Sequence, residues 1–501
     1  MNVNVVANKL PNHFDTDHLQ ADLMGHTIRG GKVTLCAQVL KLFLNIGSVM
    51  ILARLLTPSD FGIIAMVTAL TGVIAMFKDA GLSMATVQRD IVNHEQISTL
   101  FWINVALSLA LALLIAALAP VVAWFYDLEN LKNITLAVAS IFFIGGLTVQ
   151  HQALIRRQMR FGTLAKIQII SAVSGLAVAI LGALNGAGYW SLIMQMGVSE
   201  ITSLFLTWAY CRWIPGKLQR AVGTRSMVKF GGYLTGFNFV NYFARNADNI
   251  LIGKFWGGSD LGLYSKAYSL LLFPIQQING PIAAVTIPAL SRLQNDPEQF
   301  AVFFKRILVT VSSITFPLIA IIIICSKEII FLVLGDDWIA AVPIFTALAI
   351  SGFFQPIGNI TGILYVSLGR TQRMFKWGLM SSSWIILSFI VGLPYGVFGV
   401  ALSYSIAITL MMTPLILYAT HGTPLTYKDF YYSIRLPAFA TLVASFVGLY
   451  IHSILAPFGF YWLTLASTGI STLTFYLLLL YLISKDQFNQ SYKVIVSILR
   501  K

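Results

Sequence analysis

Apolar stretches long enough to cross a lipid bilayer, which takes about twenty residues, recur along almost the whole chain. Because backbone amides in hydrocarbon must pair within their own segment, we expect each stretch to form a helix. They fall into two groups of six and a final pair: Val33–Arg54, Phe61–Lys78, Leu100–Trp124, Ile134–Ile155, Ile167–Leu184, Gly188–Cys211; Gly232–Phe255, Leu263–Leu290, Ile307–Leu332, Ile339–Leu368, Trp377–Leu393, Val397–Ala419; Pro437–Leu455 and Tyr461–Ile483. The sequence therefore predicts an all-α polytopic membrane protein with fourteen transmembrane helices.

Two segments two hundred residues apart match each other, ILARLLTPSDFGIIAMVTAL from Ile51 and LIGKFWGGSDLGLYSKAYSL from Leu251. Each has a basic residue, then Ser-Asp, a gap and Gly. Because six spans are an even number, two tandem copies insert with the same orientation, related by an axis along the membrane normal. We expect an N-terminal tail (1–32), an N-lobe (33–228), a C-lobe (229–420) facing it across a cavity, and helices thirteen and fourteen with a C-terminal tail (421–501).

The net charge of +14 follows the predicted topology. With both termini in the cytoplasm, the cytoplasmic segments hold 26 Lys and Arg residues, whereas four are assigned to the outer loops: Lys132, Lys254, Lys266 and Lys327. This asymmetry is the positive-inside rule, and it predicts a multi-pass protein of the plasma membrane. Anionic membrane lipids account for the basic excess, and no nucleic-acid-binding pattern accompanies it.

The first helix of each lobe carries a polar seam. In the first span the seam residues recur at intervals of three and four, which places them on one helix face: Gln38, Lys41 and Asn45. The positions two hundred residues later are also polar: Asn238, Asn241 and Arg245. We expect both seams to line the cavity between the lobes, which the two cations would make positive.

Asp248 extends the second seam by three residues, and it permits two interpretations. It forms either a switchable pair with Arg245 or an ion pair within one helix that only stabilises the fold. Glu200, in the sixth span, is a second carboxylate at membrane depth and a second candidate for coupling to a cation such as H⁺ or Na⁺. Lys41 has no acidic residue within a turn of its helix, which favours a functional cavity.

Amides elsewhere in the C-lobe are candidates for cavity lining or for packing between helices. Gln276 lies in a span that Pro274 and Pro281 are expected to kink or break, and Asn359 follows Pro356 in the tenth span. Asp60 and Asp260, beside turn glycines, are expected to cap helices, and His452 is expected to be a packing residue. No metal or cofactor motif is present.

Several strings resemble the polysaccharide-repeat-unit flippases of the multidrug/oligosaccharidyl-lipid/polysaccharide exporter superfamily, specifically its colanic-acid-exporter-like branch. They include RGGKVTLCAQVLKLF, FKDAGLSMATVQRD, LIRRQMRF, FGGYLTGFNFVNYFARNADNILIGK, LGLYSKAY and PALSRLQND. The resemblance implies a bacterial inner-membrane protein that moves an undecaprenyl-diphosphate-linked oligosaccharide to the outer leaflet. A polysaccharide polymerase and chain-length machinery are the further partners that such a role involves.

The predicted cations suit a diphosphate, and the amides suit sugar hydroxyls. The substrate-binding candidates are Lys41, Arg245, Gln38, Asn45, Asn238, Asn241, Gln276 and Asn359, with Asp248 and Glu200 for ion coupling. One alternative is a cation-coupled drug exporter of the same superfamily, which would favour an acidic cavity. A polytopic polysaccharide polymerase is another, but the chain has no large loop with catalytic carboxylates and no catalytic motif, so we expect a transporter and not an enzyme.

Overall fold

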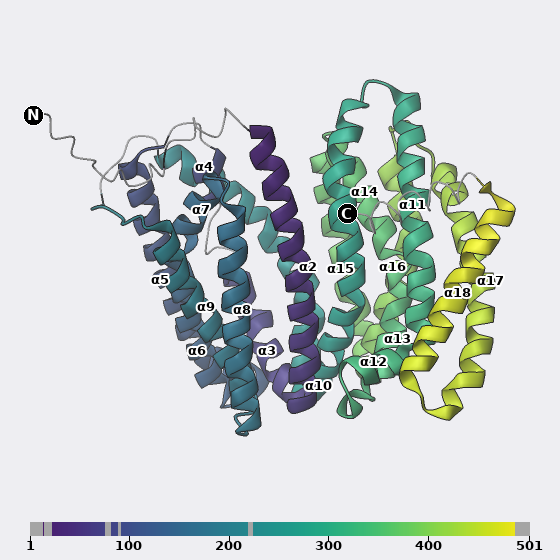
Figure 1. Cartoon of the computed structure of the whole chain (residues 1–501), viewed down its shortest axis with the longest axis horizontal. Helices are drawn as coiled ribbons and strands as arrows, with labels where there is room; N and C mark the ends of the chain where they lie inside the picture. Colours follow the sequence, from purple (N-terminus) through teal and green to yellow (C-terminus); the bar gives the residue numbers. More distant parts are fainter. Residues whose placement is uncertain (1–13, 15–22, 76–81, 89–91, 219–223, 486–501) are drawn as a thin grey trace, which may run out of the picture. The chain divides into compact units, whose positions relative to one another are not determined.

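The computed structural model describes residues 14, 23–75, 82–88, 92–218 and 224–485, and gives the backbone alone for residues 23–35, 73, 75, 82, 85, 88, 224–241 and 243–245. Every regular element in these residues is a helix (Figure 1). Eleven helical segments are long and apolar enough to cross a membrane. Two of them contain 47 and 50 residues, about twice the length that one crossing needs. The predicted all-helical, multi-pass architecture is confirmed, whereas the count of fourteen spans and the cytoplasmic termini stay predictions.

The chain forms two compact units, which divide between Phe243 and Ala244. The division falls within α10 (Thr224–Arg292), so this helix begins in one unit and ends in the other. In the first unit, α8 packs against α2 and α9, and α5 packs against α6. Its helices are α2 (Leu23–Leu55), α3 (Pro58–Ala75), α4 (Leu82–Gln88), α5 (His94–Tyr126), α6 (Leu131–Gly146), α7 (Val149–Arg157), α8 (Phe161–Leu184) and α9 (Trp190–Cys211).

In the second unit, α11 packs against α13, α14 and α17, while α16 packs against α13 and α15, and α17 pairs with α18. After α10, its elements are α11 (Pro297–Ile324), α12 (Ser326–Val333), η1 (Asp336–Trp338), α13 (Ala341–Gly352), α14 (Gln355–Ser367), α15 (Thr371–Gly392), η2 (Leu393–Tyr395), α16 (Gly396–Thr420), α17 (Tyr427–Leu455), η3 (Ala456–Phe458) and α18 (Tyr461–Ile483).

Glycines form the sharp corners of two helical hairpins in the second unit. Gly257 (φ 82°, ψ −175°) interrupts α10, and Gly396 (φ 76°, ψ −173°) separates α15 from α16. A side chain would be strained in this backbone region, which is almost exclusive to glycine. The two corners are joined, because the indole Nε1 of Trp256 donates a hydrogen bond to the carbonyl of Leu393 over 2.9 Å.

Two spans predicted as single helices are broken. Ile134–Ile155 divides into α6 and α7, and Ile339–Leu368 divides into α13 and α14. At the second break Pro356 stands in the first turn of α14, a position that needs no amide donor. By contrast, α10 is not broken at Pro274 or Pro281, where a kink or break was expected. Lys254 and Lys266 lie within α10, three residues before and nine residues after the corner at Gly257.

The two units share a type of arginine contact that the sequence did not predict. In the first unit Arg160, which precedes α8, donates to the carbonyl of Tyr210 near the end of α9 at 3.3 Å. In the second unit Arg373, in the first turn of α15, donates to the carbonyls of Tyr418 and His421 at the end of α16, at 3.0 and 2.7 Å. Each guanidinium satisfies carbonyls that a helix C-terminus leaves unpaired.

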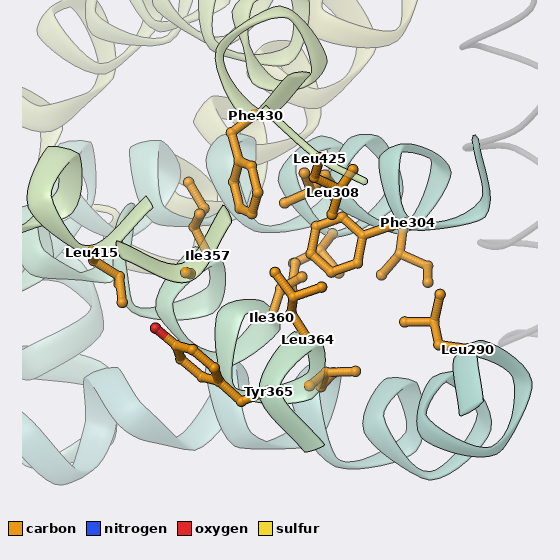
Figure 2. Packing of buried hydrophobic residues seen from close by; sticks show 14 of the residues in the cluster. Leu290, Phe304, Leu308, Ile357, Ile360, Leu364, Tyr365, Leu415, Leu425 and Phe430 are labelled. Atoms are coloured by element: carbon orange, nitrogen blue, oxygen red, sulfur yellow. The ribbon is translucent and has the colours of Figure 1, made fainter. Parts of the chain in front are cut away.

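A cluster of buried side chains holds α11, α14, α16 and the start of α17 together (Figure 2). Phe304 and Phe430 contact each other with ring centroids 5.4 Å apart, and both are fully buried. Ile360 and Leu415 belong to this cluster and also line the cavity described below. One wall of that cavity is therefore part of the hydrophobic core.

Replacing Phe430 with Ala should lower the stability of the protein by about 3–5 kcal/mol, because it leaves a void against Phe304. Phe446 on the same helix is 66% exposed, so Phe446→Ala is the matched control and should change stability little. Thermal unfolding of the detergent-solubilised protein measures both. Equal shifts in the two variants would contradict the assigned core.

Candidate functional site

The second unit contains a cavity of about 990 Å³. Its lining comes from α10, α14, α15 and α16, with Phe354 between α13 and α14. The polar lining side chains are mostly amides and hydroxyls: Asn246, Asp248, Asn249, Ser265, Tyr268, Ser269, Gln276, Asn279, Gln355, Asn359 and Tyr404. Isoleucines, methionines and phenylalanines complete the wall. Such a cavity can donate and accept many neutral hydrogen bonds along an apolar surface.

Asp248 is the acidic residue among the cavity-lining residues that the structure describes, and it is only 3% exposed. The hydroxyl of Tyr264 donates to Oδ2 at 2.9 Å, and the backbone amide of Asn249 donates to Oδ1 at 2.8 Å. Two donors therefore stabilise the buried carboxylate, which would be costly without partners.

The corner at Gly257 makes this contact possible. Asp248 and Tyr264 are sixteen residues apart in α10, and in a straight helix they would be separated by about 24 Å. Because the chain reverses at Gly257, the stretches of α10 that flank this corner in the second unit lie against each other and the tyrosine reaches the carboxylate. The local conformation of one glycine thus positions the contact between Tyr264 and the acidic residue of this wall.

A second polar chain crosses the cavity wall from α10 to α16. The hydroxyls of Tyr268 and Tyr404 lie 3.1 Å apart, and Nε2 of Gln355 donates to the Tyr404 hydroxyl at 3.4 Å and to Oγ of Ser351 at 3.0 Å. The Tyr404 ring also stacks on Phe389, with centroids 5.6 Å apart. These contacts hold aromatic faces and amide groups at fixed positions around the cavity.

The structure brings together three of the predicted site residues, Asp248, Gln276 and Asn359, in this cavity. In the first unit, Nζ of the half-buried Lys41 donates to Oε1 of Gln168 on α8 at 2.5 Å. On the same helix Gln38 and Asn45 are exposed, and Glu200 is half-buried on α9.

The other predicted seam residues fall on α10, where the structure gives the backbone alone. The side chains of Asn238, Asn241 and Arg245 therefore lie outside the described residues. Their membership of a cavity stays a prediction, as does the pairing of Arg245 with Asp248.

Sequence reasoning missed the tyrosines at positions 264, 268 and 404, and the cation Lys266. Lys266 is half-buried on α10, three residues before Ser269 and seven before Phe273, which line the cavity. That spacing places Lys266 beside the lining face of α10, although it is not itself one of the lining residues. The spacing of four between the tyrosines of LGLYSKAY places both on one helix face, and this pattern could have indicated them.

Two subsidiary expectations can be checked against the contacts. Asp60 accepts hydrogen bonds from the backbone amide and the hydroxyl of Thr57, at 2.9 and 2.8 Å, so its capping role is confirmed. His452 contacts Oε1 of the buried Glu328 through Nε2 at 3.1 Å, a partner that the sequence did not predict. Among the described residues, no group of three His, Cys, Asp or Glu side chains is arranged to hold a metal ion.

Comparison with known proteins relates the chain to proteins of surface-polymer synthesis. A family model described as "Polysaccharide biosynthesis protein" matches residues 51–343. The teichuronic acid biosynthesis protein TuaB of Bacillus subtilis is 29% identical over 301 residues, which cover 60% of this chain and 62% of TuaB. The lipopolysaccharide biosynthesis protein WzxC of Escherichia coli is 23% identical over 83% of this chain and 85% of its own. The succinoglycan biosynthesis transport protein ExoT of Rhizobium meliloti is 27% identical over 66% of this chain and 67% of ExoT.

Among solved structures, the lipid II flippase MurJ in an inward closed conformation has a TM-score of 0.69. The superposition covers 92% of this chain and 99% of MurJ, at 17% sequence identity. At this identity the likeness establishes a shared fold alone.

Replacing Tyr264 with Phe should destabilise the protein by about 1–3 kcal/mol, because Asp248 loses its side-chain donor while staying buried. Tyr365 offers a matched control, since it is 2% exposed and its hydroxyl has no hydrogen-bond partner among the described residues. Tyr365→Phe should be neutral or slightly stabilising. Thermal unfolding of both variants measures the difference, and equal effects would show that the Tyr264 contact contributes nothing.

Proposed function

Because the chain belongs to the polysaccharide biosynthesis protein family, as its sequence motifs predicted, we propose that it moves a lipid-linked oligosaccharide across the membrane. The specific substrate is an undecaprenyl-diphosphate-linked repeat unit for exopolysaccharide, capsule or lipopolysaccharide. The protein resides in the inner membrane of a bacterium and works by alternating access of a cavity. A polysaccharide polymerase and chain-length machinery receive the translocated unit.

The cavity in the second unit is the observation that carries the proposal. Its amides, including Gln276 and Asn359, and the hydroxyls of Tyr268 and Tyr404 offer both donors and acceptors. Sugar hydroxyls likewise donate and accept, so each can be paired when it leaves water. The aromatic and aliphatic wall excludes water and strengthens these hydrogen bonds.

The diphosphate needs cations at membrane depth, because its charges cannot cross hydrocarbon unaided. Lys41 and Arg245 remain our candidates from the sequence, and Lys266, beside the lining face of α10, adds a third. The guanidinium of Arg245 suits bidentate contact with phosphate oxygens. The remaining seam residues, Gln38, Asn45, Asn238 and Asn241, complete the proposed lining.

A drug exporter of the same superfamily is the second candidate, and it would need an acidic cavity for cationic compounds. Of the described residues that line the cavity, Asp248 supplies the acidic charge, and it already accepts two hydrogen bonds. The neutral hydrogen-bonding lining favours an oligosaccharide instead.

Asp248 and Glu200 are the proposed coupling groups for H⁺ or Na⁺. A change in the charge of Asp248 would act directly on the cavity wall and, through Tyr264, on both stretches of α10 that flank Gly257. Coupling requires that the ion bind one conformation better than the other.

Arg245→Ala should lower repeat-unit translocation about 10- to 100-fold, the effect of losing hydrogen bonds to a charged group. Surface polysaccharide and the inner-leaflet pool of lipid-linked intermediate, measured in a deletion strain complemented with each variant, give the readout. Arg245→Lys keeps the charge and should retain part of the activity. Normal translocation per molecule in Arg245→Ala would exclude the residue from the substrate site.

Asp248→Asn should remove or shift the dependence of transport on pH or Na⁺, since the amide cannot titrate. Glu200→Gln, tested in parallel, distinguishes the two carboxylates. Flipping of a fluorescent lipid-linked oligosaccharide in proteoliposomes, at several pH values with and without Na⁺, measures both variants. An unaltered dependence in Asp248→Asn would remove this residue from coupling.

A further inference from the structure

One face of α17 stays exposed along most of the helix. The exposed side chains recur at intervals of three and four residues, which places them on a single stripe: Lys428, Tyr431, Tyr432, Arg435, Phe439, Leu442 and Phe446. We call this stripe the α17 outer face. The opposite side of the helix is buried against α11 and α18, through Phe430, Ser433, Pro437, Ala440 and Ala444.

The beginning of the α17 outer face combines cations with exposed tyrosines. Tyr431 and Tyr432 are 65% and 54% exposed, and the Arg435 guanidinium carbon lies 4.9 Å from the centre of the Tyr432 ring. Helical side chains lean toward the N-terminus of their helix, so Arg435 reaches back toward Lys428 and the membrane surface. Two cations and two aromatic rings therefore meet at one level, where phospholipid headgroups lie.

The neighbouring helix repeats the pattern at the same end. Nζ of Lys485 lies 5.6 Å from the centre of the Tyr481 ring. Because α17 and α18 are consecutive, packed helices joined by a short connection, the end of α18 lies beside the beginning of α17 (Figure 1). The cation–π pair of Lys485 and Tyr481 therefore lies near the pair of Arg435 and Tyr432.

The acidic residue in the first turn of α17 does not neutralise this face. Asp429 accepts hydrogen bonds from the backbone amide and hydroxyl of Thr426, and it pairs with Lys305 of α11 at 3.3 Å. Its carboxylate is thereby engaged on the side of α11. The exposed cations Lys428 and Arg435 keep their charge available to a ligand.

The rest of the α17 outer face is apolar, and it is about as long as one leaflet is thick. From Arg435 to Phe446 the helix rises about 16 Å, which is about half of the 30 Å hydrocarbon core. Over this length the exposed side chains are Phe439, Leu442 and Phe446, all more than half exposed. A lipid headgroup held at Arg435 would therefore place its acyl chain along these apolar side chains.

We propose that the α17 outer face binds a diacyl phospholipid with a net negative headgroup. The headgroup phosphate contacts Lys428 and Arg435, the tyrosine hydroxyls lie at the same level, and one acyl chain follows the apolar part of the face. The ligand is a membrane lipid and not the transported one, because none of the described residues lining the cavity comes from α17 or α18. The bound lipid would stabilise the packing of α17 and α18, the helix pair outside the two predicted lobes. This inference does not depend on the proposed function.

Native mass spectrometry of the full chain, titrated with phosphatidylglycerol or with phosphatidylcholine of the same chain length, tests the proposal. One surface cation contributes about 1 kcal/mol to anionic-lipid attraction, which corresponds to roughly fivefold in affinity. Lys428→Gln and Arg435→Gln should each weaken phosphatidylglycerol binding about fivefold, and the double variant about 25-fold, with phosphatidylcholine binding unchanged. Lys376→Gln, an exposed cation on α15, is the matched control and should have little effect.

Two kinds of result would overturn the proposal. One is a lack of selectivity, seen as equal binding of the two lipids by the wild-type protein or as equal loss of phosphatidylglycerol binding in the double variant and in Lys376→Gln. The other is displacement of phosphatidylglycerol by stoichiometric undecaprenyl diphosphate in the wild type but not in the double variant, which would assign the face to the transported lipid. Since every substituted side chain is exposed, unchanged thermal unfolding confirms that the variants are folded.

Discussion

A polar group in hydrocarbon has no water to pair with, and this constraint governs each polar contact of the second unit. The Asp248 carboxylate takes its donors from Tyr264 and from the backbone of Asn249. The indole of Trp256 pairs with a carbonyl of the neighbouring corner, and Arg373 pairs with the last carbonyls of α16. Apart from the Asn249 amide, each of these partners comes from a segment that the chain must first fold back to reach. Polar pairing therefore selects the arrangement of helices that hydrophobicity alone leaves open.

The elements that sequence reasoning predicted well depend on local composition. Long apolar runs define transmembrane helices, and polar residues within them, such as Asp248, Gln276 and Asn359, attract attention because they are costly there. All three line the cavity. The division of α13 from α14 at Gln355-Pro356 likewise has a local cause, although the sequence was interpreted as one span.

The features that were missed depend on contacts between distant residues. In the sequence, Tyr264 and Tyr404 look like ordinary aromatic residues. The reversal at Gly257 brings Tyr264 to Asp248, and the packing of α16 beside α10 brings Tyr404 to Tyr268. Lys266 was counted with the outer loops, and its place near the cavity follows only from its position on α10, nine residues after the corner at Gly257. A glycine with positive φ decides where a helix ends and the chain reverses. Hydropathy does not show the position of such a glycine. Side-chain partners across such a corner cannot be deduced from periodicity.

Residues two hundred positions apart in the two units differ in chemistry at the polar wall. Two hundred residues before Asp248, Tyr264 and Lys266 stand Ser48, Ile64 and Met66, and Met66 is fully buried. At these three positions the first unit has two apolar side chains and Ser48, which accepts a hydrogen bond from Gln195 at 3.1 Å. The side chains that build the polar wall of the second unit therefore do not follow from the motif that the two segments share.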